Sequence, residues 1–262
     1  MRAGSFAGAA YGLVGAVLFA GPVLAGGMKD YGPVETVSPK STVVFSGAEA
    51  SKDASYFYSG VIYALNRDLG RDGFLLRAYG GVAMYEYDTV SVPGGRVDGD
   101  GYQVDAMLGY IWHLGHLNFS AYLGVDYQDY DLTPNDPDSD VNGDEVGFKV
   151  AADIMSAGGP VYYTLQGSYS TAFDTYWARA RVGLDTGRFV IGPEGVVLGS
   201  DGWDAQRVGG FAMLRFELSP SLLSEITVNA GYQFVSGDDS SNTGGTSGGE
   251  GAYGGIGFAM VF

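Results

Sequence analysis

The sequence predicts an all-β fold, a transmembrane antiparallel up-and-down β-barrel of about 12 strands. Three observations support this fold class. Apolar residues alternate with polar or small residues over long segments, tight and long connections alternate between those segments, and the chain ends on an aromatic residue. Glycine, tyrosine and phenylalanine are abundant, with 44, 19 and 14 residues, as expected where aromatic girdles mark both membrane interfaces.

The alternation has the period of a β-strand and runs through whole segments. In one of them, Tyr102, Val104 and Leu108 share a face, while Gln103 and Asp105 lie on the opposite face. A half-buried strand of a water-soluble protein keeps this pattern for about 4 to 8 residues, whereas a tilted strand that crosses a bilayer needs about 9 to 11. The pattern predicts strands over residues 42–51, 55–66, 73–87, 101–113, 117–130, 144–156, 160–172, 175–186, 188–199, 203–218, 223–236 and 249–262.

The connections between these segments also differ in a regular way. Those after even-numbered strands are mostly tight, as at 114–116 and 185–187. Several of those after odd-numbered strands are long and acidic, namely 88–100, 131–143 and 237–248. Bacterial barrels have short periplasmic turns and longer outer loops, and an even number of strands returns both chain ends to the periplasm.

The last predicted strand ends on Phe262, which shares a face with Ile256, Phe258 and Met260. A terminal aromatic residue on an amphipathic strand resembles the signal that the outer-membrane assembly machinery reads in barrel proteins. We therefore expect this machinery and outer-membrane lipids as partners, with Phe262 as the assembly signal.

Charged residues inside the predicted strands must face the lumen, because a Lys or Arg on the lipid side costs about 2–4 kcal/mol near the membrane midplane. Buried charges persist only when they are paired, so we expect a network of ion pairs in the lumen. Its predicted members are the cations Arg77, Lys149, Arg179, Arg181, Arg207 and Arg215 and the anions Asp105, Asp126, Asp153, Glu194 and Glu217.

One predicted strand carries an irregular motif, Gly192-Pro193-Glu194. Proline has no backbone N–H and interrupts a strand ladder. We therefore expect a bulge or bend here that turns Glu194 into the lumen, where arginines of the flanking strands could pair with it.

The N-terminus predicts export. Arg2, a small apolar core over 9–20 and the small-residue site at 23–25 are typical of a cleavable signal peptide, and the apolar run is short for the alternative, a membrane anchor helix. The expected organisation is a signal peptide over 1–25, a periplasmic segment over 26–41 and an outer-membrane barrel over 42–262. The net charge of −16 argues against nucleic acid as a partner.

No motif in the sequence predicts catalysis, a metal site or a cofactor. The two histidines, His113 and His116, lie at a predicted periplasmic turn, whereas an outer-membrane phospholipase needs its Ser–His–Asn set near the outer face, so we expect no enzyme activity. The loop Asp138–Asn142 matches the first half of a calcium-binding loop, but Lys149 stands where that pattern requires a Glu. A solvated acidic loop is the simpler interpretation.

Aromatic residues gather near the predicted outer rim, among them Tyr176, Trp177 and Trp203. An interface girdle is the simpler interpretation. A platform that stacks on sugar rings is the alternative, with Trp203 as its first candidate and Trp177 and Tyr176 beside it.

Three segments carry a resemblance to a known family: Gly73–Gly81 (GFLLRAYGG), Asp131–Asp138 (DLTPNDPD) and Phe189–Glu194 (FVIGPE). They resemble the cellulose biosynthesis protein BcsS family, from about Phe45 to the C-terminus and least over 238–248. The resemblance implies an exported protein associated with bacterial cellulose synthesis or secretion in alphaproteobacteria, and it implies no catalytic residue.

We therefore expect a non-enzymatic outer-membrane accessory of cellulose or exopolysaccharide biosynthesis or export. Components of the cellulose synthase or export complex, or the glucan chain, are the partners that this function implies. A porin-like passive channel and a structural or adhesive surface barrel are the alternatives.

Overall fold

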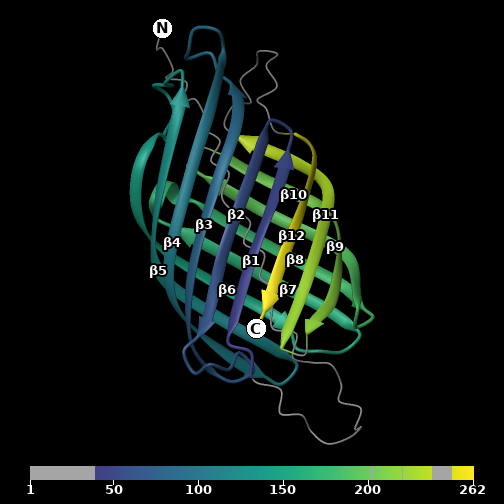
Figure 1. Cartoon of the computed structure of the whole chain (residues 1–262). Helices are drawn as coiled ribbons and strands as arrows, with labels where there is room; N and C mark the ends of the chain where they lie inside the picture. The colour runs from purple at the N-terminus through teal and green to yellow at the C-terminus, as the bar shows by residue number, and fades with distance from the viewer. Residues whose placement is uncertain (1–38, 202, 220, 238–249) are drawn as a thin grey trace, which may run out of the picture.

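The computed structural model describes residues 39–201, 203–219, 221–237 and 250–262. Twelve antiparallel strands follow one another around a closed barrel, and β1 pairs with β12 to complete it (Figure 1). The predicted fold class is therefore confirmed. The predicted signal peptide and most of the segments 26–41 and 237–248 lie outside the described residues.

The strands closely follow the predicted segments. They are β1 (Thr42–Ser51), β2 (Ala54–Ala64), β3 (Gly73–Asp88), β4 (Arg96–Leu114), β5 (Leu117–Thr133), β6 (Gly143–Ser156), β7 (Val161–Ser170), β8 (Tyr176–Asp185), β9 (Phe189–Ser200), β10 (Trp203–Ser219), β11 (Leu222–Gly237) and β12 (Gly251–Val261). A short 3-10 turn, η1 (Ala172–Asp174), separates β7 from β8. Among the described residues, no helix is long and apolar enough to cross a membrane.

The β3–β4 hairpin extends beyond the rest of the barrel at the top of Figure 1. β4 begins at Arg96 rather than at 101, and β5 ends at Thr133 rather than at 130. Asp98 and Asp100 made this segment look like an acidic loop, but both face outward, while Val97 is buried on the inner face. A strand can carry such charges on its outer face where it has left the hydrocarbon.

The expected bulge at Gly192-Pro193-Glu194 does not form. Pro193 pairs with Gly210, and Glu194 pairs with Gly209, in one unbroken register with β10. Glu194 reaches the lumen by the ordinary alternation of a strand. On the other side, the pairing with β8 lapses opposite Gly192 and Pro193, between Arg181↔Glu194 and Leu184↔Ile191, and resumes in the same register. The prediction of a bulge was therefore wrong, because the proline interrupts the ladder to β8 without inserting an extra residue.

The two faces of the wall differ as a membrane barrel requires. On the outer face, Leu123 and Phe148 are 61% and 70% exposed. Two belts of aromatic rings border this apolar band: Tyr102 contacts Tyr127 toward the outer end of the barrel, and Trp112 contacts Phe119 toward the other end, with ring centroids 5.8 and 5.3 Å apart. Such girdles lie at the headgroup level of both leaflets.

Phe262 directly follows β12, and its side chain is exposed on the outer face. Its backbone N–H donates to the carbonyl of Thr42 at 2.9 Å, and its carbonyl accepts from the N–H groups of Ser41 and Thr42. The last residue of the chain therefore helps to close the barrel against β1.

Candidate functional site: the charged lumen

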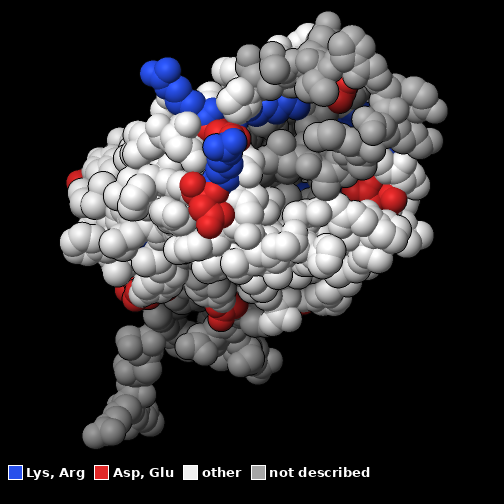
Figure 2. Space-filling view, turned by 90° about the horizontal axis from the view of Figure 1, so that it is seen from below, with Lys and Arg blue, Asp and Glu red and all other residues white. Residues whose placement is uncertain are grey.

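The predicted lumen charges gather in three places along the barrel. Figure 2 looks into the barrel from the end where β12 finishes and shows a hollow with basic side chains inside it. We call the three groups the β3–β6 cluster, the transluminal cluster and the lower cluster.

The β3–β6 cluster consists of Arg77, Asp105, Asp126, Lys149 and Asp153. Lys149 Nζ lies 2.8 Å from Asp105 and 3.6 Å from Asp126, and Arg77 Nη2 lies 3.9 Å from Asp105. All five residues are buried. Asp153 faces the lumen from β6 and forms no ion pair with another described residue. The cluster therefore holds two cations and three carboxyl groups.

Hydrogen bonds from β5 itself and from the end of β7 fix the carboxylate of Asp126. Ser170 Oγ donates to it at 2.5 Å, and Gln128 Nε2 donates at 2.9 Å. Gln128 Nε2 also lies 2.8 Å from Thr175 Oγ1. The residues around η1 thus turn inward over the lumen and contact β5, which is two strands away from β7 in the wall.

The transluminal cluster consists of Glu49, Arg179, Arg181, Glu194 and Arg207. Arg207 Nη1 donates to Glu49 Oε2 at 2.8 Å, and Arg179 Nη2 donates to the other oxygen of the same carboxylate. Glu49 lies on β1, which is not adjacent to β8 or β10 in the wall. These bonds therefore span the lumen, from β1 to strands that lie three and five positions away around the wall.

Glu194 is the second anion of the transluminal cluster. Its Oε2 lies 2.8 Å from Arg181 Nε and 3.6 Å from Arg179 Nε. Its Oε1 accepts hydrogen bonds from Asn229 Nδ2 at 2.8 Å and from Tyr253 Oη at 2.9 Å. Two arginines thus converge on one carboxylate from the same strand, β8.

The lower cluster, which consists of Asp185, Arg215 and Glu225, lies toward the end of the barrel where β12 finishes. Arg215 forms ion pairs with Asp185 at 2.6 Å and with Glu225 at 3.1 Å. Glu217, a predicted member of the network, is instead exposed at the end of β10 and forms no ion pair with another described residue. Its exposed position near the end of β10 leaves it in contact with solvent, so its inclusion in the network was wrong.

Three anions of these clusters were not among the predicted residues: Glu49, Asp185 and Glu225. Glu49 shares its face of β1 with the buried Val43 and Phe45, and these apolar residues hide the polar side of the strand. The cost of a charge facing lipid was the available signal, because a glutamate on the lipid side is also destabilising, although less so than an arginine.

The predicted aromatic platform does not form. Trp177 and Trp203 are buried on the lumen face, whereas Tyr176 lies on the outer face and its hydroxyl donates to Asp204. The guanidinium of Arg179 lies 5.2 Å from the centre of the Trp177 ring. The three rings therefore present no common surface at the rim.

A different set of rings lines the lumen beside β1, β2 and β3. The ring centroid of Tyr58 lies 6.0 Å from that of Tyr56 and 6.3 Å from that of Tyr79, and the ring planes are inclined to each other by only 23° and 22°. The ring of Tyr56 lies directly over Gly81, where any side chain would collide with it. The glycine thus lets the ring lie against the wall.

The predicted loop Asp138–Asn142 packs against its neighbours. Ser91 Oγ donates to Asp138 at 2.7 Å, and Tyr87 Oη donates to the buried Asp136 at 3.0 Å. Among the described residues, no group of three or more His, Cys, Asp or Glu side chains is arranged to hold a metal ion.

His113 lies at the end where β12 finishes and contacts the β2–β3 connection. Its backbone N–H donates to Asp72 Oδ1 at 2.7 Å, its Nδ1 lies 3.1 Å from the same oxygen, and its Nε2 lies 3.1 Å from the carbonyl of Leu69. The hydrogen bond from the His113 backbone, followed by that of its ring, lowers the pKa of the exposed Asp72. Both ring nitrogens are occupied by these structural contacts.

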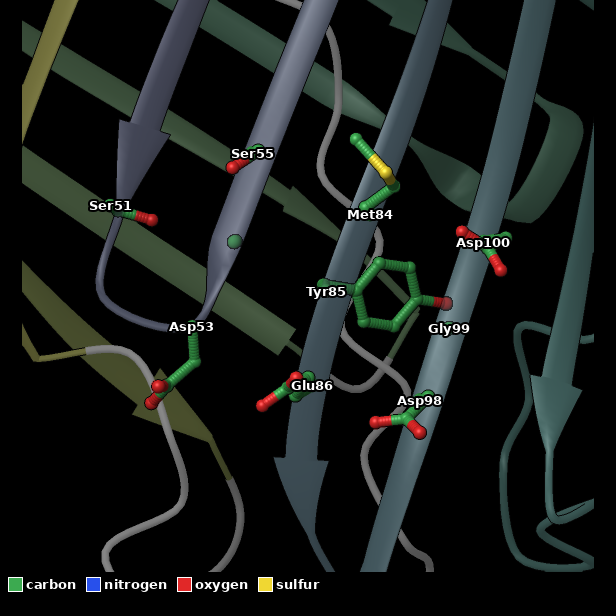
Figure 3. Close-up of a pocket in the computed structure, with 10 residues that line it drawn as sticks. Ser51, Asp53, Ser55, Met84, Tyr85, Glu86, Asp98, Gly99 and Asp100 are labelled. Atoms are coloured by element: carbon green, nitrogen blue, oxygen red, sulfur yellow. The ribbon is translucent and has the colours of Figure 1, made fainter.

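The outer rim carries an acidic pocket of about 450 Å³ between the β1–β2 turn and the projecting hairpin. Figure 3 shows Asp53 from the turn and Glu86, Asp98 and Asp100 from β3 and β4 around it. Glu86 pairs with Arg96, which lies on the same hairpin. This pocket lies at the rim, away from the lumen clusters.

An antiparallel barrel with an apolar outer face, two aromatic girdles and an ion-paired lumen is of the outer-membrane class. Within that class, a family model described as cellulose biosynthesis protein BcsS matches residues 43–262, and the chain belongs to this family. The predicted resemblance is therefore confirmed.

Among the solved structures similar to this chain are a porin and LpxR. The KdgM porin has a TM-score of 0.43 at 9% identity and covers 84% of this chain and 99% of its own. LpxR from Salmonella typhimurium has a TM-score of 0.45 at 10% identity and covers 85% of this chain and 100% of its own. None of the curated proteins matches the chain.

Proposed function

We propose that this protein is a non-enzymatic outer-membrane accessory of bacterial cellulose, or related exopolysaccharide, biosynthesis or export. A signal peptide cleaved after Ala25 would deliver it, and its partners would be cellulose synthase or export components, or the glucan chain. The match of residues 43–262 to the BcsS family is the observation that carries this proposal.

The ion pairs across the lumen support a specialised role over passive diffusion. A porin keeps a water-filled channel open. Here Arg179 and Arg207 reach Glu49 through the lumen from strands that are not its neighbours in the wall, so a solute would have to pass beside these ion pairs. An anchor, or a passage for one kind of polymer, fits this lumen better than a general channel.

The positions of the two histidines support a role without catalysis. His113 is engaged by Asp72 and by the Leu69 carbonyl, and His116 follows in the same β4–β5 turn. Neither lies near the outer face, where an enzyme acting on outer-leaflet lipids would need its general base.

Deletion of the gene, with complementation by variants, tests the proposal. We expect cellulose yield to fall in the deletion strain with unchanged outer-membrane permeability, and to recover with the wild type. Glu194→Gln should rescue poorly, while the matched control Glu217→Gln, at an exposed glutamate, should rescue fully. Unchanged cellulose in the deletion strain would contradict the proposal.

Conductance of the purified barrel in a planar bilayer separates the alternatives. A large, steady current would favour a passive channel. Silence together with normal cellulose and altered surface attachment would favour a structural or adhesive barrel.

A further inference from the structure

The transluminal cluster carries one more positive than negative charge. Its cations are Arg179, Arg181 and Arg207, and its anions are Glu49 and Glu194; each of the five residues is at most 4% exposed. The other two clusters show the opposite balance, since Lys149 and Arg77 face three carboxyl groups and Arg215 faces two. The positive excess is thus confined to one place.

The same cluster contains buried donors that other described residues do not use. Arg179 Nη1 and Arg181 Nη2 are buried and form no hydrogen bond with any described residue. Two more buried donors form no hydrogen bond with any described residue: the indole N–H of Trp177 and the hydroxyl of Tyr58. The ring of Trp177 lies under the Arg179 guanidinium. Both arginines direct Nε toward Glu194 Oε2, which leaves terminal nitrogens of two neighbouring guanidinium groups for another ligand.

A buried, uncompensated charge and buried, unpaired donors are each costly. One oxyanion would relieve both costs, because it neutralises the excess charge and accepts from two guanidinium groups at once. The planar, fixed donors of arginine match the spacing of two oxygens in a carboxylate or phosphate. Chloride would neutralise the charge but offers no pair of acceptor atoms.

We propose that the lumen holds an oxyanion-binding site built by Arg179 and Arg181, with Trp177 and Tyr58 at its edge. Its ligand class is a small carboxylate or phosphate, either free or carried by an acidic sugar. This inference does not depend on the role in cellulose production, and a failure of one leaves the other standing.

Titration of the purified, leader-free barrel in detergent tests the site. Sodium phosphate and sodium glucuronate are each compared with sodium chloride at equal ionic strength, and the midpoint of thermal unfolding and the heat of binding are recorded. We expect saturable binding and stabilisation with phosphate, glucuronate or both. The responding anion identifies a free phosphate or a sugar carboxylate as the source. An equal response to chloride, or no saturable response to either oxyanion, would overturn the proposal.

Variants of the cluster give responses of opposite direction. Arg181→Gln removes the excess charge and one arm of the site, and should weaken oxyanion binding by at least about tenfold, whereas Glu49→Gln raises the excess and should strengthen it by about tenfold. The matched control Arg215→Gln, in the lower cluster, should bind like the wild type. Arg181→Lys keeps the charge without the planar donors and should bind weakly. Unchanged affinity in folded Arg181→Gln protein would refute the assignment.

Discussion

The replacement Lys149→Met tests whether the lumen charges stabilise the barrel as a paired set. Lys149 Nζ lies 2.8 Å from Asp105 and 3.6 Å from Asp126, and the side chains of both acids are fully buried. At an effective dielectric constant of about 20, these contacts correspond to about 6 and 5 kcal/mol of gross attraction. Much of this attraction offsets the cost of removing the three charges from water.

Methionine fills a volume close to that of lysine and leaves Asp105 with Arg77, at 3.9 Å, as its remaining ion-pair partner among the described residues, and Asp126 with none. Removal of one partner of a buried pair costs about 3 to 5 kcal/mol. We expect a loss of this size in the free energy of unfolding, measured by urea titration in lipid vesicles with tryptophan fluorescence. The matched control Lys52→Met, at an exposed lysine, should change stability by about 0.5 kcal/mol or less.

A double-mutant cycle separates lost pairing from lost packing. The variant Lys149→Met/Asp105→Asn removes one charge of each sign, and it should be more stable than the sum of the single effects by about 2 kcal/mol or more. A loss below about 1 kcal/mol for Lys149→Met, or additive effects of the two changes, would refute the account of a paired lumen.

Three further predictions follow from the fold. Gly192→Ala should destabilise the barrel by about 1 to 3 kcal/mol in urea titrations, because the added Cβ would collide with the backbone of Val182. The control Gly195→Ala should be neutral, because a Cβ there meets only the carbonyl of Arg207, at 3.9 Å. Equal effects of the two substitutions would contradict the packing. Phe262→Ala should reduce the heat-modifiable, folded protein in the outer membrane several-fold without impairing refolding in detergent, and normal assembly would contradict a terminal signal. Because hydrogen bonds from His113 lower the pKa of Asp72, its carboxylate stabilises the fold above about pH 4 and loses this effect as the pH falls through the lowered pKa. Asp72→Asn should therefore lower the urea midpoint at neutral pH but not near the acid limit of folding, and a pH-independent difference would contradict this linkage.

The strand pattern could be predicted because the membrane imposes a strict rule on alternate residues. Along β4, Val104 and Leu108 are exposed on the outer face, and Gln103 and Asp105 are buried on the inner face, as the alternation indicates. The rule ends where the strands leave the membrane. Outside the membrane, Asp98 and Asp100 can lie on the outer face of a strand without facing lipid. The residue pattern therefore did not predict that β4 extends to Arg96.

The lumen cations could be placed because each would be costly on the lipid side. Their partners across the lumen could not, since the pairing of Glu49 with Arg179 and Arg207 depends on which strands face each other through the barrel. That arrangement depends on the number of strands and on their stagger around the barrel. The alternation of residues along a single strand indicates neither quantity.

The tryptophans were misplaced for a different reason. Trp177 and Trp203 lie near strand ends, where interface aromatics concentrate, and this position suggested the rim. Trp177 nevertheless shares its strand face with Arg179 and Arg181, so the parity of β8 already indicated the lumen.

The most direct test of the central claim is the environment of alternate residues along one strand. The chain has no cysteine, so single cysteines at 103–108 of β4 can carry a fluorescent label, and quenching by brominated lipid tails reports contact with hydrocarbon. The account predicts strong quenching at 104, 106 and 108 and weak quenching at 103, 105 and 107. Quenching that does not alternate, or a leader-free protein that is monomeric in water without detergent, would contradict it.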